Sequence, residues 1–133
     1  MKKVLVVDDM EGWRKFNTQA VRMLLDNDAI IDTASSGQEG YSKVLENTKE
    51  PYDIILTDMQ MESDYEPKMA GEWLIEQIQA LPSYYKTRII IISASFGVRK
   101  IAESYGVFCI PKSVASVSKE AYKEVLITPY DNH

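Results

Sequence analysis

Short apolar runs alternate with longer amphipathic stretches along almost the whole chain. Arg88 to Ile92 contains four consecutive isoleucines, and a run that is apolar at every position suits a strand covered on both faces, as in parallel sheets. The other runs of strand length are Lys3 to Val7, Ala29 to Thr33, Tyr52 to Thr57 and Val107 to Ile110. The pattern therefore predicts five buried strands.

The stretches between these strands have the apolar spacing of helices with one buried face. Local signals mark their ends: Ser36 is placed as a cap, Pro82 stops one helix and Gly106 ends another. The predicted helices run from Trp13 to Leu25, after Ser36, from Met69 to Leu81, from Gly97 to Tyr105 and from Ser116 to Leu126. Strands that alternate with helices predict an α/β fold, a doubly wound five-stranded parallel sheet flanked by helices.

One segment departs from this alternation. Residues from Glu62 to Lys68 are polar and without period, and they lie between the third strand and its helix. The chain of 133 residues has room for one domain, to which we assign residues 1–127, with 128–133 as a tail.

The amino-acid composition limits the kinds of molecule that the chain is expected to bind. The net charge of −5 disfavours direct binding to nucleic acid or to an anionic membrane surface. The apolar stretch from Val4 to Val7 is too short for a signal peptide or a membrane span. Cys109 is the single cysteine and lies in an apolar run, so we expect a thiol that packs as a small hydrophobe in a reducing cytoplasm.

Functional side chains in a parallel sheet lie just beyond the carboxyl ends of the strands. Asp8 and Asp9 follow the first predicted strand and Asp58 follows the third. Ser93 follows the fourth and Lys112 the fifth. Each has an ordinary structural explanation, since aspartates cap helices, serines lie in turns and lysines are exposed. Their joint placement at one sheet edge favours a functional site.

The carboxylates at this edge repel one another unless a positive charge offsets the repulsion. At ~4 Å and an effective dielectric constant near 20, two like unit charges repel by about 4 kcal/mol. Lys112 supplies one positive charge, and a divalent ion would supply two more. A set of oxygen ligands without histidine or cysteine favours Mg²⁺ over zinc. Magnesium keeps several waters and accepts phosphate oxygens, so the same edge suits phosphoryl chemistry.

Four motifs resemble the receiver domains of bacterial response regulators in two-component systems. They are Val-Leu-Val-Val-Asp8-Asp9, Ile-Ile-Leu-Thr-Asp58-Met-Gln-Met, Ile-Ile-Ser93-Ala94 and Ile-Pro-Lys112, and the likeness extends from about Lys3 to about Leu126. The resemblance implies the flavodoxin-like receiver fold and a signalling protein, not an enzyme acting on separate substrates. It also implies phosphoryl transfer from a sensor histidine kinase or phosphotransfer protein, and a downstream protein target.

The resemblance implies a role for each motif residue. Asp58 is the expected phosphoacceptor. Asp9, Asp58 and the backbone carbonyl of Gln60 are the expected magnesium ligands, while Asp8 holds metal-bound water. Lys112 is expected to pair with phosphoryl oxygens, and the Ser93 hydroxyl to move toward the new phosphoryl group.

Several positions depart from the family pattern. Glu62 stands where a proline usually follows the phosphoacceptor, and Gly71 comes about five residues late because of the extra segment. Cys109 stands where the family has its switch aromatic, with Phe108 one place earlier, and Ser113 replaces a common proline. These departures affect the residues that would convert phosphorylation into a change of the signalling surface.

Two other classes of function stay open. A pseudo-receiver would keep the fold and signal by protein contacts without phosphorylation. A hydrolase with an aspartyl nucleophile after the first strand, like the haloacid dehalogenases, would need an Asp-x-Asp spacing, which Asp8-Asp9-Met10 lacks.

Overall fold

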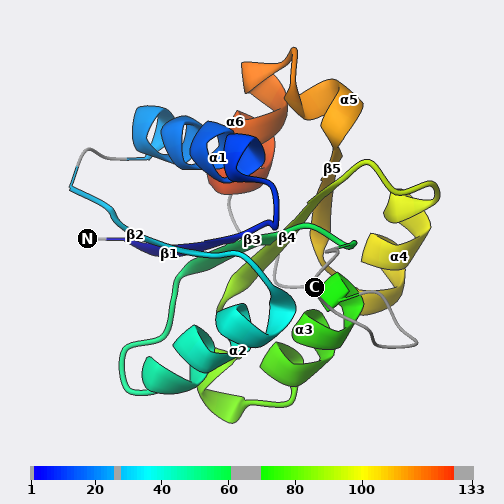
Figure 1. Cartoon of the computed structure of the whole chain (residues 1–133). Helices are drawn as coiled ribbons and strands as arrows, with labels where there is room; N and C mark the ends of the chain where they lie inside the picture. The colour runs from blue at the N-terminus through cyan, green and yellow to red at the C-terminus, as the bar shows by residue number, and fades with distance from the viewer. Residues whose placement is uncertain (1, 26–27, 61–69, 128–133) are drawn as a thin grey trace.

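Five parallel strands form one twisted sheet in a computed structural model that describes residues 2–25, 28–60 and 70–127 (Figure 1). The strand order is β2-β1-β3-β4-β5, so the sheet is doubly wound and the predicted fold class is confirmed. The strands are β1 (Lys3–Val7), β2 (Ile30–Ala34), β3 (Ile54–Thr57), β4 (Arg88–Ser93) and β5 (Phe108–Pro111).

Helices cover both faces of this sheet. Helices α1 and α6 lie over one face, and α2, α3 and α4 lie over the other (Figure 1). Their bounds are α1 (Glu11–Leu24), α2 (Gly37–Glu46), α3 (Ala70–Gln79), α4 (Val98–Tyr105), α5 (Lys112–Ala115) and α6 (Lys119–Ile127), with a 3₁₀ turn η1 at Pro82–Tyr84.

The hydrophobic core is divided by the sheet into two clusters. Along β4, Ile89 and Ile91 belong to the cluster under α2, α3 and α4, whereas Ile90 and Ile92 belong to the cluster under α1 and α6. All four are at least 95% buried, because alternate side chains of a strand point to opposite faces and both faces are covered. The run of isoleucines is thereby explained.

The last predicted helix is wrong at its start. Instead of one helix from Ser116 to Leu126, the chain forms the short α5 and then α6. The Ser118 hydroxyl accepts a hydrogen bond from the backbone N–H of Ala121 at 3.2 Å and so caps α6, whereas the Ser116 hydroxyl donates to the carbonyl of Ser113. Two serines two residues apart carry the same sequence signal, and only one is at the helix start.

Other boundaries differ by a few residues. Strand β2 begins at Ile30, and β3 begins at Ile54 rather than at Tyr52. Ser36 caps α2 as predicted, with its hydroxyl 3.0 Å from the Glu39 nitrogen. The segment Glu62 to Lys68 and the tail 128–133 lie outside the described residues. Within the described ranges, no helix is long and apolar enough to cross a membrane.

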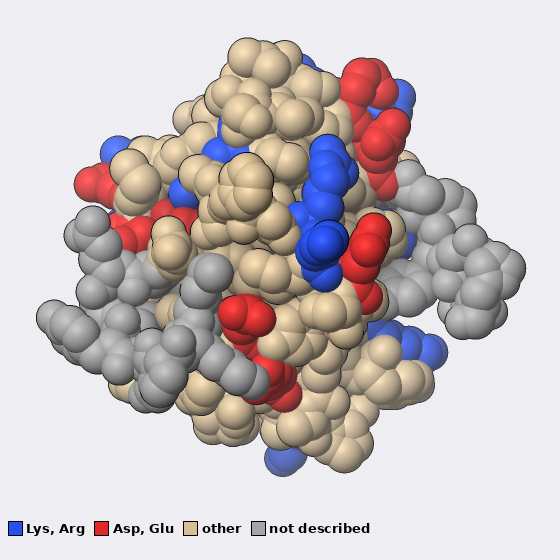
Figure 2. Space-filling model, turned by 90° about the vertical axis from the view of Figure 1, so that its right-hand side faces the viewer, with Lys and Arg blue, Asp and Glu red and all other residues tan. Residues whose placement is uncertain are grey.

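The face formed around α4 and β5 is largely uncharged. Figure 2 shows it mostly in tan, with small groups of Lys and Arg lying beside groups of Asp and Glu. On this face the described residues form no broad basic surface of the kind that binds a phosphate backbone.

Candidate functional site

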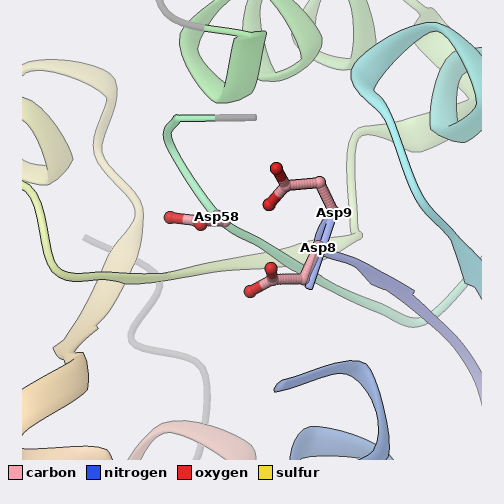
Figure 3. A group of neighbouring side chains, drawn as sticks. All are labelled: Asp8, Asp9 and Asp58. Atoms are coloured by element: carbon pink, nitrogen blue, oxygen red, sulfur yellow. The ribbon is translucent and has the colours of Figure 1, made fainter. Parts of the chain in front are cut away.

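Three carboxyl groups meet at the carboxyl edge of the sheet. Asp8 and Asp9 leave the end of β1 and Asp58 leaves the end of β3 (Figure 3). One oxygen from each lies within 4.8 Å of the others, and Asp8 and Asp58 are 0% and 7% exposed. The strands bring them together because β1 and β3 are neighbours, with Val7 paired to Thr57.

Backbone groups hold two of these carboxyl groups in place. The N–H of Met10 donates to Asp8 Oδ1 at 2.9 Å, and the N–H of Met59 donates to Asp58 Oδ1 at 2.7 Å. Met10 occupies the N-cap position of α1 and its side chain makes no capping hydrogen bond, so neither Asp8 nor Asp9 stands at that position. Occupation of the helix N-cap position therefore does not explain the Asp-Asp pair.

Lys112 joins the two buried carboxylates. Its Nζ lies 3.0 Å from Asp58 Oδ2, with hydrogen-bond geometry, and 3.1 Å from Asp8 Oδ2. The contact with Asp8 Oδ2 is an ion pair without hydrogen-bond geometry, and this buried oxygen has no hydrogen-bond partner among the described residues. Lys112 itself is only 9% exposed, at the first residue of α5.

The charges of this cluster are not balanced. Burial raises the pKa of Asp8 above its ordinary value, and the nearby Asp58 carboxylate raises it further. The Met10 N–H and the Lys112 ammonium partly offset this increase in the Asp8 pKa. With Asp8, Asp9, Asp58 and Lys112 all ionised, three negative charges face one positive charge, which leaves an excess of two. A divalent cation bound by oxygen ligands fits both the excess charge and the Asp8 oxygen that lacks a hydrogen-bond partner among the described residues.

Ser93 is the last residue of β4 and is 1% exposed. Its hydroxyl oxygen accepts a hydrogen bond from the N–H of Ser95 at 3.0 Å. Ser93 is paired in register with Pro111, the residue before Lys112, so the serine and the lysine leave adjacent strands at the same edge. Gln60 is exposed and is the last residue described after β3.

Gly71 explains how α3 approaches the site despite the extra segment before it. Its N–H donates to the carbonyl of Met59 at 2.9 Å. A Cβ atom at this position would lie 2.1 Å from the Asp58 carbonyl oxygen and 2.7 Å from Met59 Cα. Only glycine allows this contact between α3 and the backbone that carries Asp58.

The two candidate switch residues of β5 lie on different faces of the sheet. Phe108 packs against the cluster under α1 and α6, where the Arg88 guanidinium lies 5.1 Å from its ring centroid. Cys109 packs against the cluster under α2, α3 and α4. Phe108 thus does not substitute for an aromatic at position 109, because neighbouring residues of a strand point in opposite directions.

Sequence reasoning missed one neighbour of Lys112. Helical spacing places Trp13 on the apolar face of its helix, and it does pack against the core, but Lys112 Nζ also lies 4.9 Å from its ring centroid. The available signal was its place in the first turn after the Asp8-Asp9 strand end. Helical periodicity alone does not distinguish a core tryptophan from one that touches the site.

Known proteins match both the sequence and the structure. The family model of the response regulator receiver domain matches residues 4–115. A gliding motility regulatory protein of Myxococcus xanthus is 35% identical over 92 residues, which is 69% of this chain and 10% of that protein. The match therefore spans only a small part of the length of this relative.

Solved structures share the fold. The chemotaxis response regulator CheY4 of Vibrio cholerae has a TM-score of 0.72 at 22% identity, covering 95% of this chain and 96% of that one. The phosphorylated cyanobacterial phytochrome response regulator RcpA has a TM-score of 0.73 at 17% identity, covering 97% and 96%. At these identities the likeness concerns the architecture of the chain.

Proposed function

Since this chain belongs to the response regulator receiver domains of two-component systems, we propose that it is a phosphorylatable receiver with Asp58 as its phosphoacceptor. Receiver domains are signalling modules, and they interact with histidine kinases or phosphotransfer proteins and with downstream targets. The observation that carries the proposal is the buried contact of one ammonium, that of Lys112, with both Asp8 and Asp58.

We expect Mg²⁺ to be required. Asp9, Asp58 and the backbone carbonyl of Gln60 would hold the ion, and Asp8 would orient its water ligands. When bound, the ion supplies positive charge that stabilises the oxygens of the phosphoryl group during transfer. The support for this assignment is the oxygen-only donor set and the excess negative charge of the cluster.

The proposed transfer uses Asp58 as a nucleophile. A carboxylate oxygen of Asp58 attacks the phosphorus of a phosphohistidine, a new O–P bond forms, and the P–N bond breaks with its electron pair left on the imidazole nitrogen. Lys112 is already 3.0 Å from Asp58 Oδ2, so its ammonium can pair with a phosphoryl oxygen without a large movement. Positioning and charge neutralisation are what this chemistry requires from the protein.

Ser93 is proposed to report the new phosphoryl group. Its hydroxyl now accepts from the Ser95 N–H, and its own proton remains available to donate to a phosphoryl oxygen. Such a charge-assisted hydrogen bond contributes about 1.5–3 kcal/mol, enough to shift a two-state equilibrium at least tenfold. With Cys109 at the aromatic position, we propose that the change at β4 and α4 depends mainly on Ser93.

The test is intact-protein mass spectrometry after incubation with acetyl phosphate and Mg²⁺. Wild type should gain one phosphoryl group, Asp58→Asn should gain none, and chelation of Mg²⁺ should abolish the gain. Asp53→Asn is the matched control, because this exposed aspartate directly precedes the same strand at its other end. Full labelling of Asp58→Asn would disprove the assignment of the phosphoacceptor.

The same experiment separates the other classes of function. No mass gain in wild type would favour a pseudo-receiver, an alternative that the complete set of five site side chains does not favour. Continuous hydrolysis of unrelated phosphoesters would favour a hydrolase.

We also propose residues 1–127 as the extent of the domain, acting in the cytoplasm. The family match ends at residue 115, but the Tyr122 hydroxyl of α6 donates to Asn17 Oδ1 of α1 at 2.5 Å, which supports counting α6 as part of the domain.

A further inference from the structure

The Lys112 ammonium is held by charged groups on one side and by an aromatic ring on another. Asp8 and Asp58 lie at 3.1 and 3.0 Å, and the centroid of the Trp13 indole lies at 4.9 Å. A lysine ammonium within about 6 Å of a ring centroid is attracted by the negative face of the ring, most strongly for tryptophan. The side chain of Lys112 is only 10% exposed, so water screens this attraction little.

An aromatic ring is a suitable neighbour for a lysine whose ammonium changes its hydrogen-bond partner during the reaction. Lysine is a compact charge on a flexible stem, and its hydrogen bonds to carboxylates depend on direction. Attraction to a ring face depends less on direction, so the ammonium can turn from Asp58 Oδ2 toward a phosphoryl oxygen while it keeps its contact with Trp13.

Trp13 belongs to a row of aromatic side chains between α1 and α6. Trp13 packs edge-to-face on Phe16, with ring centroids 5.3 Å apart. Phe16 in turn lies 6.1 Å from Tyr122, which is 1% exposed and donates to Asn17. Phe16 is 39% exposed and Tyr122 is buried, so the row supports the Trp13 ring from one side, and such support helps to keep a functional group close to its productive geometry.

We propose that Trp13 is a positioning residue for the phosphorylation of Asp58, because its ring face holds the Lys112 ammonium at the site. The inference rests on the proposed function for its effect on rate. The contact of the ring with the ammonium does not rest on that function and can be tested by itself.

The first experiment measures the rate of phosphorylation by acetyl phosphate with Mg²⁺. Trp13→Leu should lower the rate about tenfold, and Trp13→Phe should lower it less, because phenylalanine keeps a ring face of weaker attraction. In a Lys112→Ala background, Trp13→Leu should cause no further loss, since the partner of the ring is already gone. A purely structural role of Trp13 predicts the same fold-loss in both backgrounds, and that result would overturn the proposal.

The second experiment uses the fluorescence of single-tryptophan variants and needs no phosphorylation. The chain has two tryptophans, and Trp73 packs edge-to-face on Tyr41 in the cluster on the other face of the sheet. In a Trp73→Phe background, Lys112→Ala should change the emission of Trp13. In a Trp13→Phe background, the same Lys112→Ala change should leave the emission of Trp73 unaltered.

The two experiments fail in distinguishable ways. Absence of phosphorylation in wild type would overturn the proposed function, while the emission of Trp13 would still decide the contact. Trp13 emission that is identical with and without the Lys112 ammonium would overturn the inference, even if Asp58 is phosphorylated as proposed. The phosphorylation rate of Lys112→Ala could be too low to measure. In that case the emission of Trp13 and the rates of Trp13→Leu and Trp13→Phe decide the outcome. Equal rates for these two variants and wild type would contradict the proposed role of Trp13.

Discussion

The two ends of the sheet are polar in different ways. At the amino end, Lys3 Nζ donates to Asn47 Oδ1 at 2.6 Å and to the carbonyl of Glu50 at 2.7 Å. The Tyr84 hydroxyl donates to the carbonyl of Val44 at 2.8 Å. Burial raises the pKa of Tyr84 to about 12, so its hydroxyl is a neutral donor over the ordinary pH range. Here polar groups are paired with complementary partners.

The carboxyl end is built from like charges instead. Asp8 and Asp58 share Lys112, and Asp8 Oδ2 is buried without a hydrogen-bond partner in the described chain. Incompletely paired buried charges cost folding free energy. The amino end therefore stabilises the fold, whereas the carboxyl end carries a cost in stability that fits the proposed site for a cation and a phosphoryl group.

The largest effect is expected where the fold and the site meet, at Gly71. Gly71→Ala would place a Cβ against the Asp58 carbonyl and should reduce the free energy of unfolding by about 2–4 kcal/mol. Gly12→Ala is the control: beyond its own turn of helix no atom lies within 4 Å of the added carbon, and alanine favours the helix by about 0.5–1 kcal/mol. Urea unfolding measures both, and equal stability of the two variants would show that α3 does not depend on this contact.

Loss of one hydroxyl at the amino end of the sheet should lower the free energy of unfolding. Tyr84→Phe removes the donor to Val44 and Asn47 and should cost about 1–3 kcal/mol, because buried carbonyls lose a partner. Tyr85→Phe is a control at the next residue, where the side chain is 76% exposed and a change within about 0.5 kcal/mol is expected. A loss as large in Tyr85→Phe would show that the amino end does not owe its stability to this hydrogen bond.

Magnesium should make the carboxyl end contribute to stability. At ten times its dissociation constant, the ion should raise the free energy of unfolding by about 1.4 kcal/mol. Asp9→Ala should weaken this effect, since it removes one of the three carboxylates. Thermal unfolding with and without Mg²⁺ is the measurement, and superimposed curves for wild type would rule out the metal site.

The smallest effect is expected from the pH dependence of Asp8 in metal-free buffer. Its pKa is raised by folding, chiefly by burial, so the folded state binds the proton more tightly than the unfolded state. The contribution of Asp8 to stability therefore increases as the pH falls through the raised pKa toward its ordinary value of 3.8. Asp8→Asn should be more stable than wild type at neutral pH, and the difference should shrink toward acid pH. A difference that grows on acidification would contradict the raised pKa.

The order of elements and the site positions could be read from the sequence because both are local properties. Apolar periodicity predicted the five strands, and the ends of four of them placed the candidate residues Asp8, Asp9, Asp58, Ser93 and Lys112 at one edge. The start of α6 could not be read, because Ser116 and Ser118 are equivalent caps by sequence and only packing selects one.

What only the tertiary structure decided are the contacts between residues far apart in the chain. The sequence by itself placed Asp8, Asp58 and Lys112 at one sheet edge, and the folded chain determined that one ammonium touches both carboxylates. It also determined that Trp13 covers this ammonium and that Gly71 packs on the Asp58 backbone. Such contacts depend on strand order, register and helix approach, which set distances of a few ångströms, whereas a periodic pattern specifies only which face of an element is buried.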